Sequence, residues 1–324
     1  MAFNRSPLRD ITQEDIDTYA RDGAVCLRKV FDKDWIDSLL PVSKEIKVGE
    51  KDFGLLPNIP NRYMSRVIPE FRRLAFESPL GEACGKVLQS KEVRFFFDEI
   101  FAKPPNSDRK TIWHCDRMGW PVAGKMVPSL WMPLTPITKA NSLECVAGSF
   151  THDVPYWLFS PNARKMIQPE GRPTHPDIEP LRDDPNVTFL SWDMDPGDLL
   201  IIHPWELHYS GGNPTDDWRV AISTRVFGDD ITCKPRPDCL NLAGVSWDEM
   251  IEGERPAGQL FPLIWSDDGR RDTGEDYPRG FATTWSANAG KGDAAGQAYS
   301  YKGGFEKLLE EKGGGTKVKA EELA

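Results

Sequence analysis

The sequence predicts an α+β fold in which N-terminal helices flank one all-β core. Helical periodicity dominates the chain up to about residue 90. From residue 93 onward, short segments rich in Val, Phe, Trp, Leu and Ile are separated by Pro and Gly. After residue 230 the pattern weakens and Gly, Pro and Asp become frequent. Helices followed by many short strands indicate an α+β chain, and the close spacing of the strands favours a sandwich or barrel.

The N-terminal part is expected to be mainly helical, with one strand. Thr12 precedes an acidic first turn, which is typical of a helix start, and Gly23 is placed to end that helix. The apolar residues between them repeat with the period of an amphipathic helix. The further elements expected here are a strand over residues 24–30, a second amphipathic helix over 32–46 and a helix over 71–89.

The chain is expected to form a single domain over residues 1–303. Its β core should span about residues 93–230, interrupted by a Pro-rich insertion over 151–186 that lies between two strands. Loops of this length are usually functional or disordered. Residues 231–303 are expected to pack on the core as extended excursions, and residues 304–324 to form a short helix and a disordered tail.

Composition restricts the class of partner. The formal net charge is −10, with 50 Asp and Glu against 40 Lys and Arg, which argues against nucleic acid. No apolar stretch approaches the roughly 20 residues of a membrane-spanning helix. The N-terminus is polar and lacks a secretory signal, so a cytoplasmic location is expected. The six cysteines contain no CxxC pair, so neither a zinc knuckle nor a redox dithiol is indicated. A small-molecule ligand remains as the expected partner.

Three residues carry the chemistry of a metal site. His114 and Asp116 lie two apart in the segment TIWHCD, so on a strand they point to the same face. His208 follows much later in the segment LLIIHPWELH. Two imidazoles and one carboxylate are the ligand set of non-haem iron(II) oxygenases. His203 competes with His208 for the distal position, but only His208 has an arginine eleven residues further on.

That arginine, Arg219, predicts an anion site. On the strand WRVAISTRVF it shares a face with Arg225. A buried arginine is costly unless it meets an anion, and its guanidinium suits a carboxylate. A dicarboxylate that chelates iron at one end would need such a cation at the other. A structural salt bridge is the alternative for Arg219. Arg225 is expected either to bind a substrate anion or to pair with Asp98.

Three motifs resemble the phytanoyl-CoA dioxygenase family of Fe(II)- and 2-oxoglutarate-dependent oxygenases. They are HCDRMGWPV, SLWMPLTPITKANSLECVAGSF and PGDLLIIHPWELHYSGGNPTDDWRVAISTRV. The resemblance covers about residues 12–230 and is strongest over 98–229. It implies a double-stranded β-helix, a jelly roll related to the cupins, flanked by helices.

The resemblance also assigns roles to residues. It implies that His114, Asp116 and His208 bind iron. Arg219 matches the residue that holds the distal carboxylate of 2-oxoglutarate, with Ser210 as its helper and Trp131 near the cosubstrate. The positions expected to line the substrate pocket are Asp98, Lys103 and Arg225. One departure is Cys115, which stands between two ligands where the family often has Gln.

The reaction implied uses Fe(II), 2-oxoglutarate and O2, with ascorbate as an accessory reductant, and releases succinate and CO2 while oxidising a small molecule. Hydroxylation is expected because Asp116 is retained, whereas related halogenases lack this carboxylate. Desaturation, epoxidation or ring formation would use the same residues. Two alternatives stay open on the same fold. A cupin-like metal isomerase would not need Arg219, and a non-catalytic ligand-binding module would be expected to have lost part of the triad.

Overall fold

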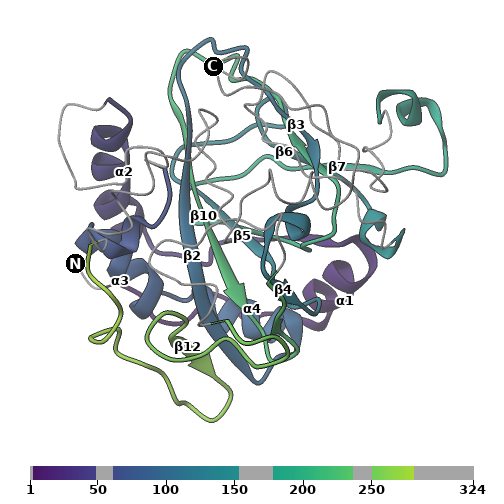
Figure 1. Cartoon of the computed structure of the whole chain (residues 1–324). Helices are drawn as coiled ribbons and strands as arrows, with labels where there is room; N and C mark the ends of the chain where they lie inside the picture. Colours follow the sequence, from purple (N-terminus) through teal and green to yellow (C-terminus); the bar gives the residue numbers. More distant parts are fainter. Residues whose placement is uncertain (1–2, 49–60, 153–177, 236–249, 281–324) are drawn as a thin grey trace, which may run out of the picture.

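The computed structural model describes residues 3–48, 61–152, 178–235 and 250–280 (Figure 1). Its strands are β1 (Ala24–Leu27), β2 (Glu92–Lys103), β3 (Thr111–His114), β4 (Val122–Ala123), β5 (Ser129–Pro133), β6 (Leu143–Val146), β7 (Phe189–Ser191), β8 (Leu199–Ile202), β9 (His208–Ser210), β10 (Arg219–Phe227), β11 (Thr232–Cys233) and β12 (Leu263–Ser266). Its α-helices are α1 (Gln13–Asp22), α2 (Lys33–Val48), α3 (Pro69–Glu77) and α4 (Leu80–Leu88). Short 3₁₀ helices cover Met64–Arg66, Asp116–Gly119, Ser149–His152 and Glu179–Asp183.

Two antiparallel sheets form the centre of the described structure. The larger has the strand order β1-β8-β5-β10-β2-β12, and the smaller has the order β3-β9-β6-β7. In Figure 1 the long strands β2 and β10 cross the middle of the molecule, with α2 and α3 to one side and β3, β6 and β7 to the other. The predicted α+β class with an all-β core is therefore confirmed.

The larger sheet is buried on both faces. Along β10, Val220 and Ile222 join the cluster that includes residues of α2 and α3, whereas Ala221 joins a cluster with Trp131 and Cys145 between the two sheets. β8 alternates in the same way, and this explains its uninterrupted apolar sequence LLII. Burying each Leu or Ile side chain of this strand contributes about 1.5–3 kcal/mol to the stability of the fold. The space between the sheets is where polar side chains of the two sheets can meet.

The boundaries of α1 follow from its caps. The Thr12 hydroxyl accepts a hydrogen bond from the Asp15 backbone, and the Asp15 carboxylate accepts one from the Thr12 backbone. At the other end Gly23 has φ +76° and its N–H donates to the Tyr19 carbonyl at 2.9 Å. The expected helix start and the stop at Gly23 are confirmed, and β1 begins at the next residue.

The single helix expected over residues 71–89 is wrong. Two helices occupy this stretch, α3 and α4, and Ser78 between them is extended, with ψ 170°. Pro79 is the reason, because its ring disfavours helical backbone at the preceding residue. The strand expected to run through TIWHCD also ends early, since β3 stops at His114 and a 3₁₀ turn begins at Asp116.

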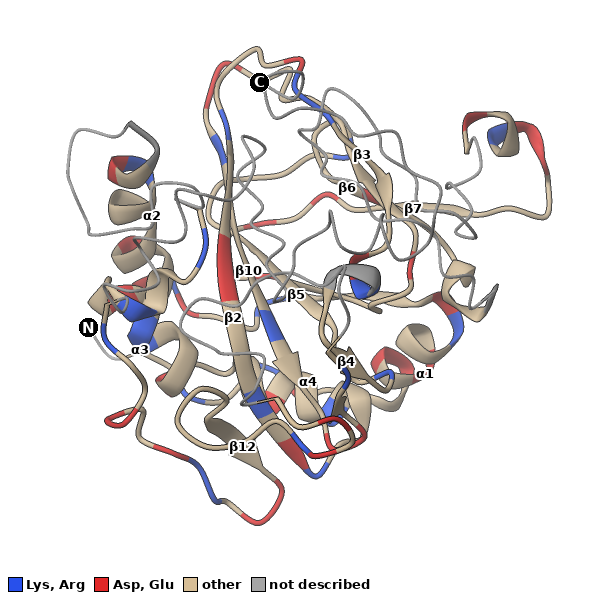
Figure 2. Ribbon diagram, viewed as in Figure 1, with Lys and Arg blue, Asp and Glu red and all other residues tan. Residues whose placement is uncertain are grey.

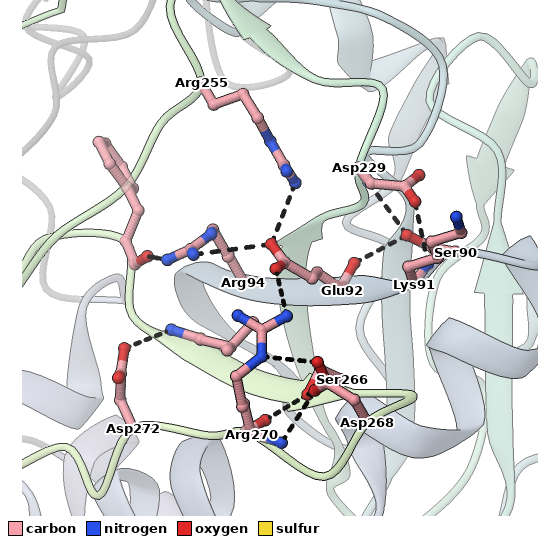
Figure 3. A network of polar contacts seen from close by, with 12 residues as sticks. Ser90, Lys91, Glu92, Arg94, Asp229, Arg255, Ser266, Asp268, Arg270 and Asp272 are labelled. Atoms are coloured by element: carbon pink, nitrogen blue, oxygen red, sulfur yellow. Dashed lines mark hydrogen bonds and ion pairs between the residues drawn. The ribbon is translucent and has the colours of Figure 1, made fainter.

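The C-terminal part adds a strand that the sequence pattern did not reveal. β12 pairs with β2 and extends the larger sheet at its edge. Around this edge, the Glu92 carboxylate forms ion pairs with Arg94 at 3.6 Å, Arg255 at 3.3 Å and Arg270 at 3.0 Å (Figure 3). The strand is short and lies among Gly and Pro residues. Its sequence therefore gives no strand signal, and it is recognised only by its pairing with β2.

The long insertion lies between β6 and β7, which pair with each other. Its residues 153–177, the short helix expected at 304–312 and the C-terminal tail fall outside the described residues. None of the helices in the described ranges is long and apolar enough to cross a membrane.

Candidate active site

His114, Asp116 and His208 come together between the sheets. The two histidines are directly opposite each other on the paired strands β3 and β9, and their ring centroids are 4.2 Å apart. Asp116 Oδ1 lies 3.6 Å from His114 Nε2 and 4.0 Å from His208 Nε2. One ligand atom from each residue can be chosen so that all three lie within 4.8 Å of one another. This spacing suits three ligands of one metal ion.

Backbone carbonyls fix the tautomers of both histidines. His114 Nδ1 contacts the Ile112 carbonyl at 2.7 Å, and His208 Nδ1 contacts the Glu206 carbonyl at 2.9 Å. A carbonyl only accepts hydrogen bonds, so each Nδ1 carries a proton, and in the neutral tautomer the lone pair is on Nε2. Burial and the neighbouring His114 lower the pKa of His208 to about 4, which keeps this imidazole neutral at physiological pH.

The carboxylate of Asp116 is held on one oxygen. Its Oδ2 accepts a hydrogen bond from Ser129 Oγ at 2.5 Å and lies 3.5 Å from Arg225 Nη2. Burial alone would raise the pKa of Asp116, but the charge of Arg225 and the contacts with His114 and His208 hold that pKa well below its usual range. Asp116 is therefore ionised, with Oδ1 directed towards the imidazole nitrogens.

A second polar cluster, here called the cationic corner, contains two buried cations, Arg219 and Lys103. Arg219 is 3% exposed and Lys103 is 7% exposed. Within the described residues, Arg219 Nε and Nη2 have no hydrogen-bond partner. Burial lowers the pKa of Arg219 to about 10; burial and the charges of Arg219 and Arg109 lower the pKa of Lys103 to about 7. Buried donors of this kind are costly unless an anion binds them, so the corner has the character of an anion site.

Ser210 and Trp131 complete this corner. Lys103 Nζ donates to Ser210 Oγ at 3.0 Å and to the Ser210 carbonyl at 3.2 Å, and it also contacts the Gly211 carbonyl. The guanidinium of Arg219 lies 5.1 Å from the centre of the Trp131 ring, a distance at which the cation is attracted by the ring face. Lys103, expected among the substrate residues, thus lies beside Arg219. The sequence alone could not predict this place for Lys103, because it depends on the cross-strand pairing of Arg219 with Lys103.

Three other residues differ from their expected surroundings or settle an open choice. The expected pairing of Arg225 with Asp98 is wrong, because Arg225 pairs with Glu99 at 3.2 Å and approaches Asp116. Strand alternation turns Asp98 to the opposite face of β2, where its carboxylate accepts a hydrogen bond from the Ser65 N–H at 2.9 Å. Asp98 therefore points away from the metal-binding group. His203 is not part of that group, and its ring packs 4.4 Å from that of Phe150.

The donor set fits iron(II) with a dicarboxylate. Two imidazoles and one carboxylate match the protein ligands of non-haem iron oxygenases. The orphaned nitrogens of Arg219 supply the cation that such a cosubstrate needs at its far end. Cys115, between two of the candidate ligands, is buried, and burial raises its pKa to about 12, so it remains a neutral thiol. Fold and site together define a jelly-roll protein of the non-haem iron type.

Comparison with known proteins identifies the family. Residues 19–221 match the model of the phytanoyl-CoA dioxygenase (PhyH) family, so the chain belongs to this family of 2-oxoglutarate-dependent non-haem iron oxygenases. A "probable phytanoyl-CoA dioxygenase" of Caenorhabditis elegans is 27% identical over 164 residues. This match covers 47% of either chain, so it spans about half the length of that relative.

Solved structures share the fold at low sequence identity. The carbocyclase SnoK from nogalamycin biosynthesis superposes with a TM-score of 0.60 at 17% identity, covering 81% of this chain and all of SnoK. The epimerase SnoN gives 0.58 at 18% identity, covering 78% of this chain and 98% of SnoN. EctD from S. alaskensis gives 0.58 at 18% identity, covering 79% and 90%. SnoK and SnoN are described as non-haem α-ketoglutarate-dependent enzymes. At these identities the likeness establishes the fold, and the predicted double-stranded β-helix is confirmed.

Proposed function

We propose that this chain is a dioxygenase that oxidises a C–H bond of a small-molecule metabolite, with hydroxylation as the reaction. His114, Asp116 and His208 would hold Fe(II), and Arg219 would bind the distal carboxylate of 2-oxoglutarate. The observation that carries the proposal is that an intact three-ligand group and two buried cations, Arg219 and Lys103, come from the two sheets that face each other. A cupin-like isomerase would have no use for that corner, and a binding module would have no need of the triad.

Each group of the chain has a defined task in this reaction. When bound, the iron couples the oxidation of 2-oxoglutarate to succinate and CO2 with the oxidation of the substrate. The histidines bind through Nε2, because each Nδ1 proton is fixed on a carbonyl. Arg219 orients the cosubstrate by gripping its distal carboxylate, and Lys103 adds charge while holding Ser210 in place. The apolar cluster around Trp131 excludes water from this end of the site.

Hydroxylation is favoured over halogenation because the carboxylate ligand is present. Asp116 would take the metal position that chloride needs, and Arg225 favours the ionised form of this carboxyl. Desaturation, epoxidation and ring formation use the same residues, and product analysis distinguishes them from hydroxylation.

A small-molecule substrate is supported by two observations. The structural relatives include enzymes solved with nogalamycin RO and with 5-hydroxyectoine, both small organic compounds. The net charge of −10 also disfavours a polyanionic partner. A metabolite without a nucleotide-sized phosphate group is therefore the class to screen first.

The proposal is tested by measuring succinate formed from 2-oxoglutarate by anaerobically purified protein after addition of Fe(II) and O2, with and without ascorbate. We expect slow succinate release that a true substrate accelerates. His208→Ala should abolish it and Arg219→Ala should weaken it strongly. No succinate from the wild-type protein, even with a broad metabolite set, would contradict the proposed function.

A further inference from the structure

Three adjacent strands of the larger sheet each direct one polar residue towards Asp116. On β10, Arg225 is directly opposite Ser129 of β5. On the other side of β10, Ser223 is opposite Glu99 of β2, so Glu99 is the diagonal neighbour of Arg225 on the same face. Figure 2 shows the resulting acidic and basic stretches on the neighbouring strands β2 and β10.

The contacts form a continuous chain from Glu99 to the candidate metal ligand. Glu99 Oε2 lies 3.2 Å from Arg225 Nη1, and Arg225 Nη2 lies 3.5 Å from Asp116 Oδ2. Ser129 Oγ donates to the same Oδ2 at 2.5 Å. Glu99 and Arg225 are each 5% exposed, so water screens this chain little.

Both ends of the Glu99–Arg225 pair are themselves fixed. Glu99 Oε1 accepts hydrogen bonds from Asn61 Nδ2 at 2.8 Å and from Arg62 Nε at 3.1 Å. The Arg225 guanidinium lies 5.2 Å from the centre of the Phe97 ring. Contacts within the protein therefore hold both members of the pair.

Asp116 needs such support because of its place in the chain. It begins the 3₁₀ turn after β3 and so lies outside the strand ladder that fixes His114 and His208. A carboxylate left free there could rotate and offer either oxygen, or both, to a metal. Two donors on Oδ2 remove this equivalence and leave Oδ1 as the oxygen nearest to both imidazoles.

We propose that Ser129, Arg225 and Glu99 are positioning residues that present Asp116 to the metal through Oδ1 alone. This inference rests on the metal site of the proposed function. Hydrogen-bond partners of metal ligands typically change metal affinity by about 10–100-fold when removed. Ser129 and Arg225 act directly on Asp116, and Glu99 acts through Arg225.

The test uses Co(II) as the probe metal on the full chain without 2-oxoglutarate. Calorimetric titration gives its affinity, and the visible absorption of bound Co(II) reports its coordination. We expect Ser129→Ala and Arg225→Met to weaken Co(II) binding by about 10–100-fold and to alter the absorption spectrum. Arg225→Lys should recover part of the affinity, because it restores a cation, and Glu99→Gln should have a smaller effect of the same sign.

Glu92→Gln is the matched control. Glu92 is also on β2 and forms ion pairs with Arg94 and Arg270, but it lies seven residues from Glu99, roughly 20 Å along the strand. This variant should bind Co(II) like the wild-type protein. Thermal unfolding of the metal-free variants checks their folding, and Ser129→Ala, the smallest change, decides the outcome if the arginine variants do not fold.

The two proposals fail in different ways. Wild-type affinity and an unchanged spectrum in Ser129→Ala and Arg225→Met would overturn the positioning role while leaving the metal site intact. If the wild-type protein binds no Co(II) or Fe(II), the metal site itself is wrong and the positioning role falls with it.

Discussion

Arg219 and Lys103 are directly opposite each other on the paired strands β10 and β2, and both side chains are buried. Two like charges in such a pair repel each other, and within the described residues no ion pair with a carboxylate offsets this repulsion. The cost is reduced when an anion binds to both side chains on this face of the sheet. The strand register, which places these two cations side by side, therefore favours binding of the anionic cosubstrate at this point.

Replacing Arg219 should remove 2-oxoglutarate binding without removing the metal. Arg219→Met loses hydrogen bonds to a charged group, worth about 1.5–3 kcal/mol each, so the affinity for 2-oxoglutarate should fall at least about 100-fold. Anaerobic calorimetry with metal present measures this. Arg182→Met is the control, because Arg182 pairs with Glu144 and Glu179 and lies on the exposed side of the smaller sheet. Equal affinities in the two variants would refute the assignment of Arg219.

Binding of 2-oxoglutarate should weaken as the pH rises through about 7. The pKa of Lys103 is lowered to about 7, so its charge is present below that pH and is lost above it. Bound dicarboxylate favours the charged form, so binding above pH 7 should also take up a proton. We expect about a tenfold loss of affinity from about pH 6 to about pH 8.5, since one charged contact contributes roughly 1.5 kcal/mol.

Lys103→Arg separates this effect from other titrations. A guanidinium stays charged throughout this range, so the variant should bind 2-oxoglutarate with little dependence on pH. Lys103→Met should bind weakly at every pH. A wild-type profile as flat as that of Lys103→Arg would show that Lys103 does not contribute its charge.

Gly23→Ala should destabilise the fold by about 3 kcal/mol or more. Gly23 has φ +76°, and an added Cβ would contact the Glu206 carboxylate and lie 2.6 Å from Phe150 Cδ1. The control is Gly253→Ala, at φ +88° with no atom within 4 Å of the added Cβ, which should cost only about 1 kcal/mol of conformational strain. Urea unfolding compares the two. Similar losses would mean that the contact with Glu206 and Phe150 is easily relieved.

Local sequence signals predicted the parts of the fold that depend on neighbouring residues. The capping pattern at Thr12 and the glycine at position 23 gave both ends of α1. The three motifs that resemble the family gave His114, Asp116 and His208, which the structure brings together. The break between α3 and α4 was also present in the sequence, at Pro79, but the apolar periodicity across residues 71–89 concealed it.

Features that depend on strand register were not predictable. Arg225 was expected to meet Asp98, yet the pairing of β10 with β2 places Glu99 on its face and turns Asp98 away. This register runs unbroken from Arg219 to Arg225, and no local pattern in the sequence marks it. The same pairing brings Lys103 to Arg219. β12 was missed because its only partner is the edge of β2.

Metal-dependent binding of 2-oxoglutarate tests the central claim most directly. Anaerobic calorimetry on the wild-type protein should show one Fe(II) site, and one 2-oxoglutarate site that appears only when the metal is bound. His208→Ala should lose both, whereas Arg219→Met should keep the metal and lose 2-oxoglutarate. If 2-oxoglutarate binds without the metal and without Arg219, the claim that it binds to both of them is wrong.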